Sequence, residues 1–149
     1  MKKLILASIF FIGAMQAVNA QQFKVITVVE SIVPGGIGRS RIIDSKEEIN
    51  YKSLTTERED GSDGKAQRKI DRDDAKIESL EETKLLNFYS LMGINFQNIA
   101  SNDAIITSKL NDMAKQGYEL TFVTSGVESD AGDKDGKGIF ITRFIFKKK

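Results

Sequence analysis

The sequence predicts an α+β domain in which a small antiparallel β-sheet is covered on one face by one or two helices. Three observations support this fold class. The segment Phe23–Val33 is rich in β-branched residues, which favour strands. Residues 101–116 carry apolar side chains at helical spacing. Two alternating segments, 118–124 and 139–146, flank a long polar stretch, as in a β-hairpin.

The first twenty residues have the composition of a bacterial secretory signal peptide. Lys2 and Lys3 precede an apolar run over residues 4–15, and Val18-Asn19-Ala20 closes it with small residues. We expect cleavage after Ala20, so that residues 21–149 form one exported domain, periplasmic or extracellular. The apolar run is short for a membrane span, and no second run of membrane length follows.

The amino-acid composition excludes several kinds of reactive group and metal site. It contains neither cysteine nor histidine, so disulfides, lipid-modified cysteines and thiolate or imidazole nucleophiles are excluded, and ordinary zinc or copper sites are not expected. We therefore predict no metal and no cofactor. Without Lys2 and Lys3, the net charge of +1 becomes about −1, which gives no basic footprint for nucleic acid.

The first hairpin is predicted from its turn. Pro34-Gly35-Gly36 follows the Phe23–Val33 strand, and these residue types favour a β-turn. Residues 39–43 then return as the partner strand. Because apolar residues lie on both faces of the first strand, we expect it to be at least partly covered on each side.

The segment 45–74 differs from its surroundings in being dense in charged residues. It cannot bury enough apolar surface to offset the conformational entropy of ordering a chain. We expect a mobile insertion within the single domain.

Two helices are predicted after this insertion. The first is capped by Asp74 and ends near Gly93, with apolar residues at helical spacing (Ile77, Leu80, Leu85, Phe88 and Met92). A connection over residues 94–99 leads to the second helix, which either Ser101 or Asn102 can cap and which Gly117 ends.

The candidate ligand-binding residues are Arg39, Ser40 and Arg41. They follow a glycine-rich turn whose backbone amides, with two arginines, suit an anionic group. The pattern matches neither phosphate-binding glycine motif, so glycines that only form a turn are the simpler explanation, and contact with an anion or glycan is the alternative. The segment 130–136 resembles a calcium loop but lacks its first and twelfth ligands, so a solvated turn is expected there.

No catalytic constellation is predicted. Glu30 is the one carboxylate in a largely apolar strand, and we expect it to pair with a basic neighbour. Ser31 and Lys24 lie on opposite faces of that strand, so they cannot form a Ser–Lys pair.

The segment Leu110-Asn111 to Gly117-Tyr118-Glu119-Leu120, with the aromatic–basic end at 144–147, resembles a family of small uncharacterised bacterial domains. Their motif is L-N-x(5)-G followed by W/Y-E-L, and this chain is similar to their longer exported form from Bacteroidetes-type bacteria. The resemblance implies a compact α+β fold, and it assigns no activity because the family is uncharacterised. Its motif also has a structural interpretation, in which Gly117 adopts a left-handed conformation that ends a helix.

These observations predict a non-enzymatic binding module of the cell envelope with an unknown protein or glycan partner. Its contact surface is the first hairpin, the insertion or an uncovered sheet edge. The alternatives are a carboxylate-dependent hydrolase, which requires a concave pocket with converging acids, and a self-assembling structural component of the envelope.

Overall fold

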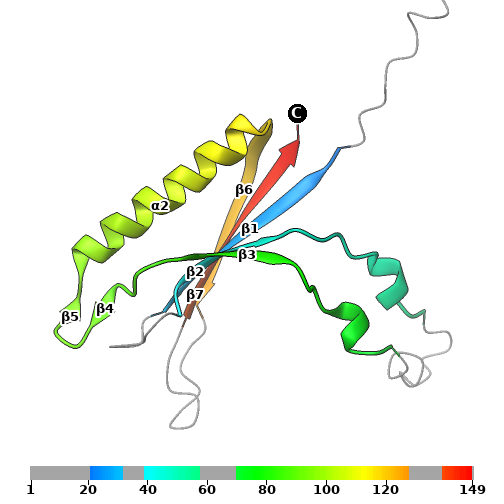
Figure 1. Cartoon of the computed structure of the whole chain (residues 1–149), viewed down its shortest axis with the longest axis horizontal. Helices are drawn as coiled ribbons and strands as arrows, with labels where there is room; N and C mark the ends of the chain where they lie inside the picture. The colour runs from blue at the N-terminus through cyan, green and yellow to red at the C-terminus, as the bar shows by residue number, and fades with distance from the viewer. Residues whose placement is uncertain (1–20, 32–38, 58–69, 128–138, 149) are drawn as a thin grey trace, which may run out of the picture.

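The computed structural model describes residues 21–31, 39–57, 70–127 and 139–148. Its main feature is a five-stranded sheet in the order β3-β2-β1-β7-β6, with every neighbouring pair antiparallel (Figure 1). A two-stranded ribbon of β4 and β5 leads into one helix, α2. The elements are β1 (Phe23–Ser31), β2 (Arg41–Ser45), η1 (Tyr51–Leu54), η3 (Asp73–Ala75), β3 (Leu80–Lys84), β4 (Tyr89–Ser90), β5 (Gly93–Ile94), α2 (Phe96–Lys115), β6 (Tyr118–Val127) and β7 (Ile139–Lys148).

The fold class and the two predicted hairpins are confirmed. β1 and β2 pair antiparallel from Ile26 opposite Asp44 to Val29 opposite Arg41. β6 and β7 pair antiparallel along almost their whole length. β1 also pairs with β7 over nine residues, which places the first and last described strands side by side in the middle of the sheet.

The predicted helix over residues 77–92 is wrong. This segment forms the edge strand β3 and the short ribbon of β4 and β5. Of its five regularly spaced apolar residues, only Leu85 is buried, whereas Met92 is almost fully exposed. Gly93 does not end a helix but lies in the ribbon with a φ of 107°, a conformation that glycine adopts without strain.

The predicted start of the second helix is also wrong, by nearly two turns. α2 begins at Phe96, and the Asn95 side chain caps it by accepting a hydrogen bond of 3.2 Å from the Asn98 amide. Asn102, one of the two expected caps, is buried inside the helix, where its side-chain amide bonds both the N–H and the C=O of Leu86. The predicted end at Gly117 is confirmed, with a φ of 84°.

The hydrophobic core lies between α2 and one face of the sheet. Its fully buried members come from β1, β2, β7, α2 and the residue after β3: Ile26, Val28, Ile42, Phe146, Met113 and Leu85. Burying a side chain of this size stabilises a fold by about 1.5–3 kcal/mol. The apolar stripe predicted for α2 therefore faces the sheet, and Leu110 packs against this core in a partly buried position.

The opposite face of the sheet, called here the outer face, carries exposed apolar residues. Directly paired residues share a face, so Val25, Ile145 and Phe122 form one row across β1, β7 and β6. Phe122 and Val25 are exposed, whereas Ile145 is partly buried. Coverage of β1 is thus tight on the α2 side and incomplete on the other.

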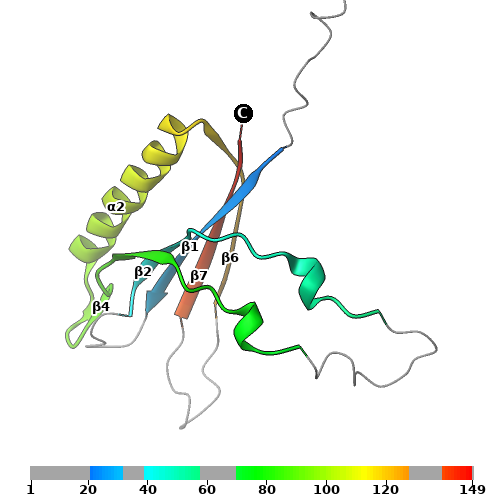
Figure 2. The same cartoon turned by 45° about the vertical axis from the view of Figure 1, so that its right-hand side comes forward.

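The β2–β3 hairpin continues beyond the sheet as an arm made of residues 46–57 and 70–79. The arm extends away from α2 in both views (Figures 1 and 2). Two hydrogen bonds join its two sides, from Lys46 N to Ser79 O and from Glu78 N to the Glu47 carboxylate. Part of the predicted insertion therefore has secondary structure, namely η1 and η3, while residues 58–69 lie outside the described part of the chain.

Candidate functional site

Among the described residues, the most distinctive surface is the free edge of β6, the terminal strand of the sheet. After Glu119 the remaining eight residues of β6 carry no charge and include Leu120, Phe122 and Val127. All of them are exposed. A long, uncharged edge strand of this kind is a template for pairing with another strand, and most proteins protect such an edge.

The other edge of the sheet shows that protection. β3 reads Leu-Glu-Glu-Thr-Lys, so three of its five residues are charged. Arg41 pairs with Glu82 at 2.5 Å, and Lys46 pairs with Glu81 at 2.9 Å. Charged side chains on an edge strand disfavour further strand pairing. The two edges therefore differ sharply in their capacity to accept a partner.

A shallow hollow of about 370 Å³ lies at the C-terminal half of β6. It is lined by residues 124–127 together with Ile141 and Arg143 of β7. Gly126 lies in this wall, and a Cβ added there would meet no atom of the chain within 4 Å. Glycine inside a strand often marks a place where another chain approaches closely.

A β-bulge between Leu120 and Phe122 sets the direction of the β6 side chains. Leu120 lies opposite Phe146 of the core face, whereas Phe122 lies opposite Ile145 of the outer face. From Phe122 to Val127 the strand is regular, so Phe122, Thr124 and Gly126 share the outer face. Phe122 is 60% exposed there.

A charged cluster lies on the inner face, where Asp44 of β2 is only 2% exposed. Its carboxylate contacts the ammonium groups of Lys24 at 2.9 Å, Lys46 at 3.2 Å and Lys109 at 2.7 Å. Burial alone would raise the pKa of this carboxyl, but the hydrogen bonds and charges of the three lysines outweigh it and lower the pKa to about 2.

Glu81 takes part in the same cluster through Lys46 and, at 3.7 Å, through Lys109. The hydrogen bond from Lys46 lowers the pKa of Glu81, and the Glu81 carboxylate in turn raises the pKa of Lys46. The cluster thus links β1, β2, β3 and α2. All of its charged groups face charges of the chain itself, so we assign it a structural role.

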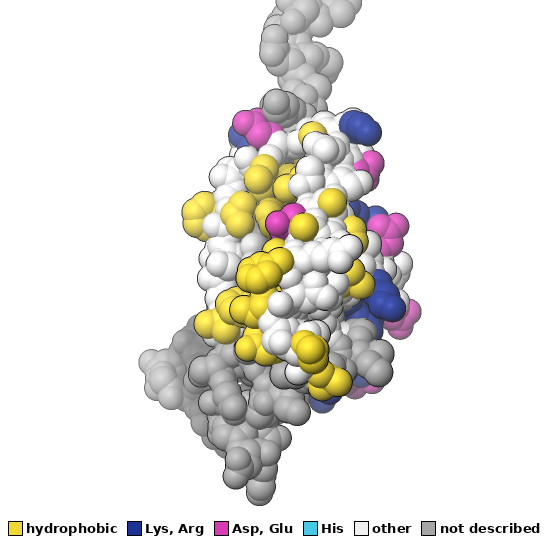
Figure 3. Space-filling view, turned by 90° about the vertical axis from the view of Figure 1, so that its left-hand side faces the viewer, with side chains coloured by type: hydrophobic (Ala, Val, Ile, Leu, Met, Phe, Trp, Pro, Cys, Tyr) yellow, Lys and Arg dark blue, Asp and Glu magenta, His cyan; other side chains and the backbone are white. Residues whose placement is uncertain are grey.

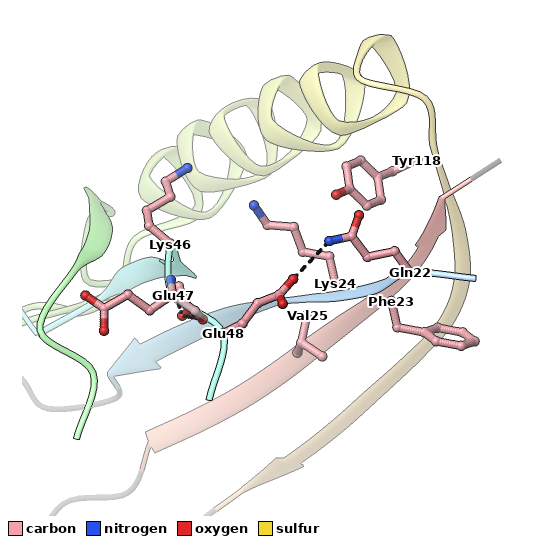
Figure 4. A pocket seen from close by; sticks show the side chains of 9 residues that line it. Gln22, Phe23, Lys24, Val25, Lys46, Glu47, Glu48 and Tyr118 are labelled. Carbon is pink, nitrogen blue, oxygen red and sulfur yellow. Dashed lines mark hydrogen bonds between the residues drawn. The ribbon is translucent and has the colours of Figure 1, made fainter. Parts of the chain in front are cut away.

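Beside this cluster lies a pocket of about 300 Å³ (Figure 4). It opens where the chain after β2 diverges from β1, and Lys24, Lys46 and Tyr118 are among its lining residues. Gln22 donates a hydrogen bond of 3.1 Å to Glu48 across it. The pocket mixes both signs of charge and presents no group selective for one ligand.

A second cleft, also of about 300 Å³, contains two carboxylates. Glu30 and Asp103 line it together with apolar residues, among them Phe88 and Phe140. The two rings lie 6.0 Å apart in a tilted arrangement. The Glu30 carboxylate accepts a hydrogen bond of 3.2 Å from Asn102, so within the described part of the chain its partner is an amide and not the expected base.

The ribbon of β4 and β5 carries a second exposed apolar surface. Leu91 and Met92, which join the two strands, are 87% and 98% exposed, and Ile94 and Phe96 follow them. Hydrophobic side chains gather on this side of the molecule in Figure 3. Nothing on this surface indicates what would cover it.

The three predicted ligand-binding residues do not converge. Ser40 is buried, where its hydroxyl accepts from the Ser31 amide at 3.0 Å and donates to Asn87 at 2.8 Å. Arg41 is held by Glu82, and Arg39 is exposed. The glycine turn before them and the calcium-like segment 130–136 both lie outside the described residues.

The described residues contain no group of three or more carboxylates arranged to hold a metal ion. Within the same ranges, no helix has both the length and the apolar character needed to cross a bilayer.

Sequence reasoning missed the Asp44 cluster, and it named an uncovered sheet edge without identifying that edge as β6. The Asp44 cluster could have been expected from the first hairpin, because the pairing of β1 with β2 brings Asp44 beside Lys24. The edge of β6 had only the absence of charge after Glu119 as its signal. Comparisons with protein-family models, with curated proteins and with solved structures found no match to this chain.

Proposed function

We propose that this chain is a non-enzymatic binding module of the cell envelope, which receives an extended segment of a protein partner along β6. The observation that carries the proposal is the uncharged, exposed edge of β6 beside a shallow hollow. Export to the envelope is supported by the signal-like composition of residues 1–20.

Strand addition explains how such an edge binds. The backbone of the added strand supplies hydrogen bonds, and alternate side chains contact the face of the sheet. On the outer face those side chains meet Phe122 and the hollow beside Gly126. Because β6 has no charge after Glu119, the edge favours a partner segment that is itself uncharged and rich in β-branched residues.

This proposal predicts that a charge on β6 weakens peptide binding. The probe is a fluorescent peptide of alternating threonine and valine with a flexible soluble tail, and binding is followed by fluorescence anisotropy. Val123→Lys is expected to weaken binding by at least about tenfold, because an edge lysine opposes strand pairing. Leu80→Lys is the matched control, since Val123 and Leu80 are each 44% exposed and lie on opposite edges of the sheet.

A version of the peptide with proline at alternate positions is expected not to bind, because proline removes backbone donors. Equal affinities of the two lysine variants, or equal binding of the proline peptide, would show that β6 is not the receiving edge.

A hydrolase is the second candidate, favoured by the cleft that holds Glu30 and Asp103. Two carboxylates in a partly apolar cleft are the arrangement that carboxylate-based hydrolysis requires. If this candidate is correct, hydrolysis of a panel of glycoside and ester substrates falls by at least about a hundredfold in Glu30→Gln. The same substitution leaves binding at β6 unchanged.

A further inference from the structure

We propose that the segment received by β6 is β6 of a second copy of this chain, paired antiparallel about Thr124. This inference rests on the proposed function, because it names the partner of the same edge. The two sheets then join into one continuous sheet related by a two-fold axis that passes beside Thr124.

The register follows from the outer face of β6. In antiparallel pairing about Thr124, Phe122 of one copy lies directly opposite Gly126 of the other, and the symmetry repeats this contact. Phe122 is a large exposed side chain, and Gly126 leaves open space beside it. An aromatic residue covering a glycine on the neighbouring strand is a recognised way to stabilise strand pairing.

The remaining pairs in this register are also compatible. Val123 lies opposite Ser125 on the inner face, and Thr124 lies opposite its own symmetry mate on the outer face. No charged residue of β6 falls within the paired segment 122–126, so the pairing brings no like charges together. A charged partner peptide would find no opposite charge on this segment, whereas the same segment of a second copy is also uncharged.

The apolar surface continues across the proposed interface. The row of Val29, Ile141 and Gly126 ends at the edge of one copy, and the Phe122 ring of the other copy, which lies opposite Gly126, extends it. The opposite edge of the sheet cannot form such a pair as readily, because β3 would place its own glutamates against those of its mate. Self-pairing is therefore specific to β6.

The first test measures the dimer dissociation constant by sedimentation equilibrium. The full chain without residues 1–20 is expected to form a concentration-dependent dimer, and Phe122→Ala is expected to raise its dissociation constant by at least about tenfold. Phe23→Ala is the matched control and should leave the constant unchanged, since Phe23 is also an outer-face phenylalanine and is 58% exposed.

The second test uses the absence of cysteine from the chain. Residues that face each other across an antiparallel pair have Cα atoms about 4.5–5.5 Å apart, a separation that a disulfide can bridge. Thr124→Cys is expected to give a covalent dimer in oxidising buffer, seen on a non-reducing gel. Leu80→Cys, on the other edge, should remain largely monomeric at the same protein concentration.

A chain that stays monomeric up to about 1 mM, where only very weak association escapes detection, would overturn the second-copy inference. So would a dimer that Phe122→Ala and Phe23→Ala weaken equally. Failure of the inference is distinguishable from failure of the proposed function. If only the second-copy inference fails, the threonine–valine peptide still binds the wild type and not Val123→Lys. If the proposed function fails, the peptide has the same affinity for the wild type and for Val123→Lys.

Discussion

Replacing Asp44 with asparagine is expected to lower the free energy of unfolding by about 2–4 kcal/mol. The substitution keeps the size of the side chain but removes the negative charge that Lys24, Lys46 and Lys109 share. Three ammonium groups would then face one another without their common counter-charge. Urea denaturation followed by circular dichroism measures the change. The lysines retain some contact with solvent, which keeps the loss below that of a fully buried pair.

The same interaction predicts how stability depends on pH. The pKa of Asp44 falls from 3.8 to about 2 on folding, so the ionised carboxylate stabilises the folded state. This contribution, about 2 kcal/mol, is fully present above about pH 4 and is lost as the pH falls through about 2. The wild-type protein should therefore lose more stability than Asp44→Asn between these two pH values.

Glu82→Gln is the control for this prediction, because Glu82 also pairs with a basic residue, Arg41, but is itself exposed. Exposed ion pairs contribute little to stability, so the free energy of unfolding of Glu82→Gln should differ from that of the wild type by less than about 1 kcal/mol. If Asp44→Asn and Glu82→Gln unfold at the same urea concentration, the cluster does not stabilise the fold as described.

Phe146→Ala is expected to cost about 3–5 kcal/mol, the usual range for removing a buried phenylalanine ring. Phe146 lies on β7, and it is fully buried in the core that α2 and the inner face of the sheet enclose. The surrounding residues come from three strands and the helix, so they cannot collapse easily into the space left by the ring. Chemical denaturation at several protein concentrations measures this loss.

The control is Phe23→Ala, since Phe23 lies on the neighbouring strand β1 and points to the outer face. An exposed ring contributes much less to stability, so we expect Phe23→Ala to lower the free energy of unfolding by less than about 1 kcal/mol. Equal losses for the two phenylalanines would mean that the sheet does not have the inner and outer faces assigned to it.

The strands were predictable where the sequence alternates or concentrates β-branched residues. β1, β6 and β7 all fall within a few residues of the segments expected from such patterns. The region 77–92 was not predictable in this way, because apolar residues three to five positions apart fit a helix without requiring one. Leu80 belongs to an edge strand, and Met92 is in contact with solvent. Tertiary pairing of β3 with β2 decides that conformation, and single-sequence periodicity does not contain it.

The sequence could predict that the candidate site is an uncovered sheet edge, but not which strand forms that edge. An uncovered sheet edge follows from any small antiparallel sheet, but strand order decides which edge is free, and no local pattern encodes that order. The role of Gly126 becomes visible only when the space beside it is known. Arg39 and Arg41 were candidates because they are charged residues beside a turn. The structure separates the three residues: Ser40 is buried and bonded to Ser31 and Asn87, Arg39 is exposed, and Arg41 pairs with Glu82.

The strand order also has a consequence for biogenesis. β1 is among the first parts of the domain to be synthesised and β7 is the last, yet they are adjacent in the sheet. The middle of the sheet therefore cannot close until translation is nearly complete, and loop closure over such a distance makes folding slow. A stop codon before residue 139 would leave β6 without a partner strand among the described strands of the sheet.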